Sequence, residues 1–282
     1  MKRSRNLKSI KRRSLKNGGK AIMELKDINK HERDSHIYMD EPTHVYYLDG
    51  VPMSISGTGF LHLFFDPFEP YKVARELCKK AKPDTKYYGK TVEEIVAMWS
   101  VGTNAGTIMH KNIEDFFNGL IPEERITNKD DFGLFQIFYK LFNKWGLEPY
   151  RTEWIIYDKD YDIAGSIDFV ARNKKTGNFW VFDWKRSNKF SRNSFHEKKG
   201  KRVCDDVEDC NGNHYQIQVN LYQHILEKNY GITIEQCVLV NLHPDLKEPD
   251  LLMAEDMQHK IKEMVSYWTD NKEQLLKEHK KH

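Results

Sequence analysis

The stretch Ala164-Gly-Ser-Ile-Asp-Phe-Val170, followed by Val181-Phe-Asp-Trp-Lys185, decides the fold of this chain. Together with residues 153–157 these segments predict three strands of an antiparallel meander, separated by polar turns. Successive side chains of a strand point to opposite faces, so Asp183 and Lys185 leave the same face of the sheet. Neither charge is stable when buried without a partner. The two residues therefore form either a structural ion pair or a metal-binding acid beside a catalytic lysine.

A second acid, Asp168, lies on the strand next to Asp183 in the predicted meander. Two carboxylates on adjacent strands can hold a hard divalent cation through their oxygens. Such a cation makes a nucleophile from water and neutralises charge on a phosphate during its hydrolysis. In that case Lys185 positions the water or stabilises the phosphorane.

The elements around the meander predict a mixed fold, α/β or α+β. An Asp49-Gly50 pair between apolar runs predicts a hairpin. Apolar periodicity predicts helices and one buried strand on either side of the meander. The predicted helices cover 69–82, 91–119, 131–146, 214–229 and the chain from about 254 onward, and the buried strand covers 237–242. Gly102 and Gly106 mark an expected break in the second of these helices.

Charge is distributed unevenly along the 282 residues, whose formal net charge is +3. Residues 1–20 contain nine Lys or Arg and no acid, so the rest of the chain is net acidic. This segment is either a flexible solubilising arm or a basic arm that binds nucleic acid or directs nuclear localisation. We expect a flexible tail at 1–20, a hairpin and helical region at 21–100 packed on the core, and a core at 101–282.

Membrane proteins and disulfide-rich secreted proteins are disfavoured function classes. The most apolar run, 59–65, is far shorter than the ~18 residues of a membrane span. The four cysteines form no C-x-x-C pair, and no secretory signal is recognisable. We therefore expect a reducing intracellular compartment, with nucleus, cytoplasm and mitochondrion left open.

The order of five motifs resembles the PD-(D/E)XK nuclease superfamily, and in particular its RecB-like branch. The motifs are Gly106-Thr-Ile-Met-His110-Lys-Asn-Ile-Glu114, Glu153, Asp168, Asp183-Trp-Lys185 and Gln218-Val-Asn-Leu-Tyr222. Around residues 163–188 the chain is similar to mitochondrial genome maintenance exonucleases, and other segments look like viral and phage relatives. The resemblance covers about residues 100–245. It implies a restriction-endonuclease-like core, with a central mixed sheet flanked by helices and an N-terminal helical part.

The resemblance also implies a set of residue roles. The metal ligands would be His110, Asp168, Asp183 and the backbone carbonyl of Trp184, with Mg²⁺ or Mn²⁺ as the cation. Lys185 would be the catalytic lysine, beside Asp168 and Asp183. Glu114 would either orient His110 or be a solvated helix acid, and Glu153 would either reach the site through water or pair with a base.

DNA contacts are expected from two segments. By the resemblance, the helix that carries Gln218 and Tyr222 lines the DNA groove. The basic run after the third strand, which includes Arg186, Lys189 and Arg192, suits tracking of phosphates. The function implied is a metal-dependent DNA nuclease, most simply an exonuclease that prefers single strands. The alternatives are a structure-specific endonuclease and a non-catalytic DNA-binding module of the same fold.

Overall fold

The computed structural model describes residues 16–17, 20–21, 23–121, 126, 129–194 and 197–279. Its helices are α1 (Leu25–Ile28), α2 (Gly57–His62), α3 (Pro70–Lys80), α4 (Val92–Phe117), α5 (Lys129–Phe142), α6 (Asn211–Asn229) and α7 (Gln258–His279). Its strands are β1 (Lys16–Asn17), β2 (Lys20–Ala21), β3 (Ile37–Asp40), β4 (Val45–Leu48), β5 (Val51–Pro52), β6 (Ile55–Ser56), β7 (Leu147–Asp158), β8 (Ile163–Asn173), β9 (Phe179–Lys185), β10 (Ile234–Asn241) and β11 (Asp250–Met253). Apart from 16–17 and 20, the predicted basic tail lies outside the described residues.

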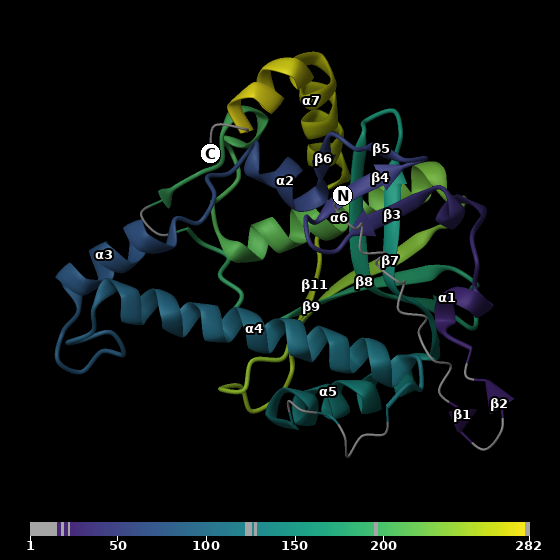
Figure 1. The fold of residues 1–282 in the computed structure, drawn as a ribbon, viewed down its shortest axis with the longest axis horizontal. Coiled ribbons are helices and arrows are strands. Elements are labelled where there is room, and N and C mark those ends of the chain that lie inside the picture. The colour runs from purple at the N-terminus through teal and green to yellow at the C-terminus, as the bar shows by residue number, and fades with distance from the viewer. Residues whose placement is uncertain are drawn as a thin grey trace, which may run out of the picture.

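The central sheet is mixed, as expected from the sequence. β7, β8 and β9 form the predicted antiparallel meander. β9 continues through α6 into β10, which pairs with β9 in parallel, and β11 adds an antiparallel edge strand. The short strand β6 joins the other end of the sheet by pairing with β8 in parallel. The chain thus has an α+β core with a central mixed sheet between helices (Figure 1).

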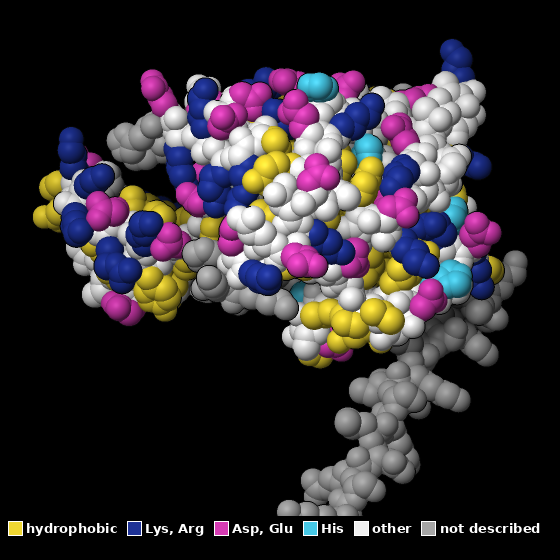
Figure 2. All heavy atoms as spheres, turned by 90° about the horizontal axis from the view of Figure 1, so that it is seen from above, with side chains coloured by type: hydrophobic (Ala, Val, Ile, Leu, Met, Phe, Trp, Pro, Cys, Tyr) yellow, Lys and Arg dark blue, Asp and Glu magenta, His cyan; other side chains and the backbone are white. Residues whose placement is uncertain are grey.

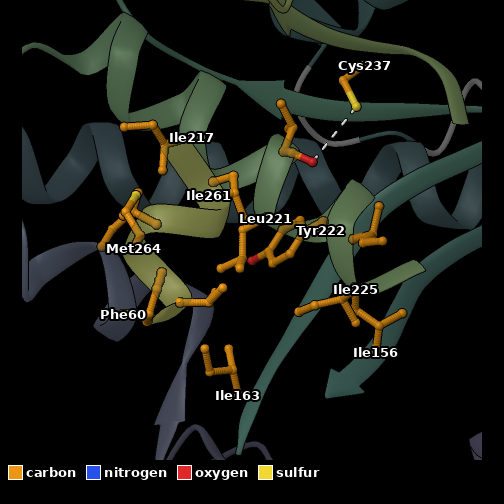
Figure 3. Close-up of a cluster of buried hydrophobic side chains, with 14 of the residues drawn as sticks. Phe60, Ile156, Ile163, Ile217, Leu221, Tyr222, Ile225, Cys237, Ile261 and Met264 are labelled. Carbon is orange, nitrogen blue, oxygen red and sulfur yellow. Dashed lines mark hydrogen bonds between the residues drawn. The ribbon is translucent and has the colours of Figure 1, made fainter. Parts of the chain in front are cut away.

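Two apolar clusters hold the helices on opposite faces of the sheet. Alternation along β9 sends Val181 to one cluster and Phe182 and Trp184 to the other. The first cluster packs α2, α6 and α7 on the sheet, and Figure 3 shows Tyr222 of α6 inside it. The second, rich in aromatic rings, packs α4 and α5 on the opposite face. Both faces of the sheet are therefore covered by helices.

The N-terminal region adds a hairpin and a projecting arm. β4 and β5 pair across Asp49 and Gly50, both at positive φ, which confirms the predicted hairpin. α3 and the first turns of α4 extend away from the body at the left of Figure 1. We call residues 68–99 the arm. The predicted break at Gly102 and Gly106 is wrong, because α4 is one continuous helix.

Candidate active site

The candidate site lies where one edge of β8 changes partner. On this edge β8 pairs with β9 only over residues 169–172 and with β6 only over residues 163–164. The segment 165–168 between them has no strand partner on that side. Instead, Oδ2 of Asp168 accepts a hydrogen bond from the backbone N–H of Trp184 at 2.7 Å. The strands thus part at Asp168, which gives its carboxylate access to the opening.

Three side chains from three elements meet at this opening. His110 of α4, Glu153 of β7 and Asp168 of β8 each offer a ligand atom, and these atoms lie within 4.8 Å of one another. Nδ1 of His110 is 3.6 Å from Oδ1 of Asp168. The donor set of one imidazole nitrogen and two carboxylates suits a divalent cation such as Mn²⁺ or Mg²⁺. These residues can therefore hold the metal that the sequence analysis expects.

Glu153 holds this place at a cost in backbone conformation. Its φ of 43° lies in the left-handed region, which is uncommon for a residue with a side chain. The register of β7 and β8 sets it across from Asp168, and Oγ of Ser166 donates a hydrogen bond to its Oε2 at 3.1 Å. Strained backbone of this kind clusters at functional sites. Glu153 is thus a candidate ligand, in a more direct position than the sequence analysis assigned to it.

Burial and mutual charge set the protonation of these groups. Burial favours a lower pKa for His110, but the negative Asp168 outweighs it and raises that pKa to about 9. Burial and the charge of Asp168 raise the pKa of Glu153 to about 8. Burial opposes ionisation of Asp168, yet His110, Lys185 and the Trp184 N–H hold its pKa below the usual value. Asp168 is therefore the permanent anion of the group.

Asp183 and Lys185 leave the same face of β9, as predicted, and form an ion pair of 2.7 Å. Burial raises the pKa of Asp183 to about 6. The lysine amine also lies 3.5 Å from Oε1 of Gln218 and 4.7 Å from the ring centre of Tyr215. Because Asp183 and Asp168 outweigh the effect of burial, the pKa of Lys185 is raised and the amine stays charged. The pair therefore presents a fixed cation beside the carboxylates.

The two residues expected to line a DNA groove from α6 have different positions. Gln218 contacts Lys185 with its oxygen and donates from Nε2 to the hydroxyl of Tyr222 at 3.1 Å. Tyr222 is only 4% exposed, and its ring packs against Gly57 and Gly165. A Cβ on Gly165 would lie 2.5 Å from Cε1 of Tyr222, so any other residue there would require the tyrosine ring to shift. Tyr222 thus supports Gln218 from within the core and does not face a groove.

The remaining predicted residues divide into paired and exposed groups. Glu114 accepts a hydrogen bond from Lys111 at 2.8 Å, and His110 is oriented by Asp168 instead. Arg186 donates to the buried Asp131 at 2.9 Å. Lys189 is exposed, and Arg192, 3.7 Å from Glu255, is 62% exposed. Only the exposed pair is readily available for phosphate contacts.

The structure adds a backbone contact of Trp184 and two residues in the walls of the groove. The N–H of Trp184 binds Asp168, and because N–H and C=O of a strand residue point to the same side, its carbonyl faces the same opening. Strand β3 and the turn between β3 and β4 supply Met39 and His44 to the walls of the groove, and neither residue was among the predicted site residues.

The site opens into a groove of about 1270 Å³. One wall is α4, from Trp99 to Glu114, and the opposite wall includes Glu153 and Ser166 of the sheet. Lys185 and Arg186 line it as well. His110, Glu153 and Lys185 therefore face a space large enough for a segment of polymer.

Comparisons with known proteins give limited similarity. No protein-family model matches the chain, and no curated protein matches its sequence. Among solved structures, a candidate exonuclease from Eubacterium rectale is similar with a TM-score of 0.42 and 11% identity, over 80% of each chain. A protein designated SSO0001 gives a TM-score of 0.26 and 15% identity, over 71% of this chain and 82% of that one. Among the described residues, no helix has the length and apolarity needed to cross a bilayer.

Proposed function

We propose that this protein is a metal-dependent nuclease of the PD-(D/E)XK type that hydrolyses phosphodiester bonds in DNA. The observation that supports it is the meeting of His110, Glu153 and Asp168 within 4.8 Å, beside the Asp183–Lys185 pair. A purely structural ion pair of Asp183 and Lys185 would give no reason for a histidine and a strained glutamate to lie beside it. Perturbed pKa values inside a groove favour a functional site.

In the proposed hydrolysis, some of these residues bind the metal and Lys185 supplies positive charge. His110 and Asp168, with Glu153 or Asp183 and the Trp184 carbonyl, would hold a divalent cation, which would supply water activation and neutralisation of phosphate charge. Lys185 supplies a fixed positive charge for the oxygen that becomes more negative in the transition state. Asp183 holds the lysine amine at 2.7 Å, and Gln218 limits its movement from the other side. Tyr222 in turn holds the amide of Gln218.

We further propose exonuclease action with a preference for single strands. The motif order of the RecB-like resemblance supports this, together with the position of exposed Lys189 and Arg192 directly after the catalytic strand. Both side chains are exposed, and the exposed pair of Arg192 with Glu255 exchanges readily for another anion, so both can follow phosphates as the strand leaves Lys185. DNA is therefore the proposed partner, and Mg²⁺ or Mn²⁺ the proposed cofactor.

The test compares end-labelled linear and covalently closed circular DNA, each single- and double-stranded, with Mg²⁺, Mn²⁺ or EDTA. An exonuclease degrades linear single strands, leaves circles intact and stops in EDTA. Cutting of circles would indicate the endonuclease alternative. Binding without cleavage under any metal would indicate a non-catalytic module and contradict the proposal. Asp168→Asn serves as the inactive control.

A further inference from the structure

A second cleft, of about 900 Å³, lies between the arm and the C-terminal end of α7. We call it the arm cleft. Its walls come from four parts of the chain: the end of α2, the start of α3, residues 201–202 and residues 278–279. None of its lining residues belongs to the groove of the candidate active site. The arm cleft is therefore a separate feature that the proposed chemistry does not use.

The lining of the arm cleft has a small excess of positive charge, with four Lys or Arg (Lys72, Arg75, Lys201 and Arg202) against three carboxylates (Asp66, Glu69 and Glu278). Asp66 is shared by Lys198 and Lys201, at 3.1 and 2.8 Å, and their hydrogen bonds lower its pKa to about 2. Arg202 pairs with Glu278 at 2.6 Å. Lys198 also pairs with Asp209 at 2.7 Å, so two carboxylates face these two lysines. Figure 2 shows Lys and Arg side chains interspersed with Asp and Glu on the arm and on the neighbouring part of the molecule.

Two cations on α3 are available for a ligand. Arg75 is exposed and has no ion-pair partner within the part of the chain that the structure describes. Lys72 pairs with Glu69 at 2.9 Å, but both side chains are more than half exposed. Exposed pairs of this kind contribute little free energy and exchange readily for another anion. The cleft thus offers uncommitted positive charge.

Aromatic rings connect the arm cleft to the active-site groove. Phe68 and Tyr71 line the cleft and are 64% and 52% exposed. The ring of Phe68 meets the edge of Trp99 at a centroid distance of 5.3 Å. Trp99 lines the active-site groove. One aromatic pair therefore spans from one cavity to the other.

We propose that the arm cleft binds the sugar-phosphate backbone of a single nucleic-acid strand whose other end occupies the active-site groove. Arg75, Lys72 and Lys201 contact phosphates, while Phe68 and Trp99 stack on bases between the two cavities. Exposed aromatic rings beside a cationic groove are the usual means of binding single strands. A small anion would need the charges but not the rings. The inference rests on the proposed function of the groove and gives it an extended strand site.

The test reverses two charges and compares oligonucleotide lengths. Lys72→Glu/Arg75→Glu is compared with Lys79→Glu/Lys80→Glu, which makes the same charge change on the same helix outside the cleft. Affinities for fluorescent oligothymidylates of about 4 and about 20 nucleotides, in EDTA, are measured by anisotropy at several salt concentrations. The cleft variant should lose about tenfold or more in affinity for the long strand only. Its log affinity should depend less on log salt, by about 0.7 per lost contact.

Each other result overturns the proposal. Equal losses for both lengths, or equal losses in both variants, would mean that the arm acts only through its general charge. An unchanged affinity for the long strand would exclude the cleft from the strand path, and inorganic phosphate that binds wild type but not the cleft variant would then mark a small-anion site. Wild-type protein that binds neither oligonucleotide would also contradict it.

A second measurement uses the unaltered protein. Long oligonucleotides with photoreactive thymine analogues at successive positions should crosslink to Phe68 or Tyr71 from some positions and to the active-site groove from others. Crosslinks confined to the groove contradict the proposal. Cleavage by wild type with Mn²⁺ is scored separately. Length-dependent binding without cleavage would contradict the nuclease function and support strand binding in the arm cleft. Cleavage without the length effect would support the nuclease function and contradict strand binding in the arm cleft.

Discussion

Asp168 accepts the backbone N–H of Trp184 at the point where β8 and β9 stop pairing. A side chain thus takes over a hydrogen bond that the sheet would otherwise make. One carboxylate oxygen, Oδ2, accepts this hydrogen bond, and the other, Oδ1, faces His110. Structural and chemical roles of Asp168 therefore belong to different atoms and can be separated by mutation.

Asp168→Asn should remove activity and leave the fold intact. The amide oxygen of asparagine still accepts the Trp184 N–H, but the negative charge that holds a cation is lost. We expect cleavage to fall by about 1000-fold or more, because metal catalysis contributes several kcal/mol. The free energy of unfolding, from urea titration, should stay near the wild-type value. Asp168→Ala should cost about 1–3 kcal/mol, since it leaves a buried N–H unpaired. Equal stability of both variants would contradict the structural role.

Lys185→Met should lower kcat by about 100- to 1000-fold, the usual loss when one electrostatic donor is removed. Methionine keeps the length of the buried stem and removes the charge. Single-turnover cleavage measures the effect, and Lys175→Met, at an exposed lysine in the turn before β9, is the matched control. A Lys185→Met enzyme with wild-type kcat would show that the Asp183–Lys185 pair is only structural.

Metal binding should release protons and strengthen with pH. With pKa values of about 9 and about 8, His110 and Glu153 both carry a proton at pH 7, and a cation must displace both. Raised pKa values mean that protons compete best at low pH, so affinity rises from about pH 6 to about pH 9. Calorimetric titration with Mn²⁺ in two buffers of different ionisation enthalpy counts the protons. The Glu153→Gln variant should release one proton fewer on binding Mn²⁺. An affinity for Mn²⁺ that does not change with pH would contradict the assignment of His110 and Glu153 as metal ligands.

Gly165→Ala should destabilise the protein by about 1–3 kcal/mol, the usual cost of overpacking. The new Cβ would lie 2.5 Å from Tyr222, whose displacement would also loosen Gln218. Gly133→Ala is the matched control, because no atom lies within 4 Å of a Cβ there and the site is helical. Urea denaturation should show a lower free energy of unfolding for Gly165→Ala and a slightly higher one for Gly133→Ala. A stable Gly165→Ala protein would mean that Tyr222 yields easily.

Local patterns in the sequence were sufficient for the meander and the hairpin. Alternation and turns predicted β7 to β9, and Asp49-Gly50 predicted the β4–β5 turn because both residues tolerate positive φ. The break in α4 was wrong. Each glycine costs a helix only about 1 kcal/mol, and this helix has a capping box at Thr91 and Glu94 and packs against α5.

Long-range pairing was not predictable from local patterns. β6 has two residues, so nothing near it indicates that it pairs with β8, more than 100 positions away. The close approach of Glu153 to His110 depends on the register of β7 and on the path of α4, and neither follows from periodicity. The buried Asp131 binds Arg186, but it lies on a face of α5 whose aromatic residues predict only core packing.

The continuity of α4 has a mechanical consequence. Trp99 and His110 belong to one helix, and a rise of 1.5 Å per residue puts them about 16 Å apart along its axis. The helix thus carries a ring proposed to stack on bases near one end and a proposed metal ligand further along. A force that tilts the arm would either move the imidazole of His110 or bend α4 at Gly102 or Gly106. In the proposed mode of binding, a pull on the strand at the arm would therefore reach the proposed metal ligand through a single backbone.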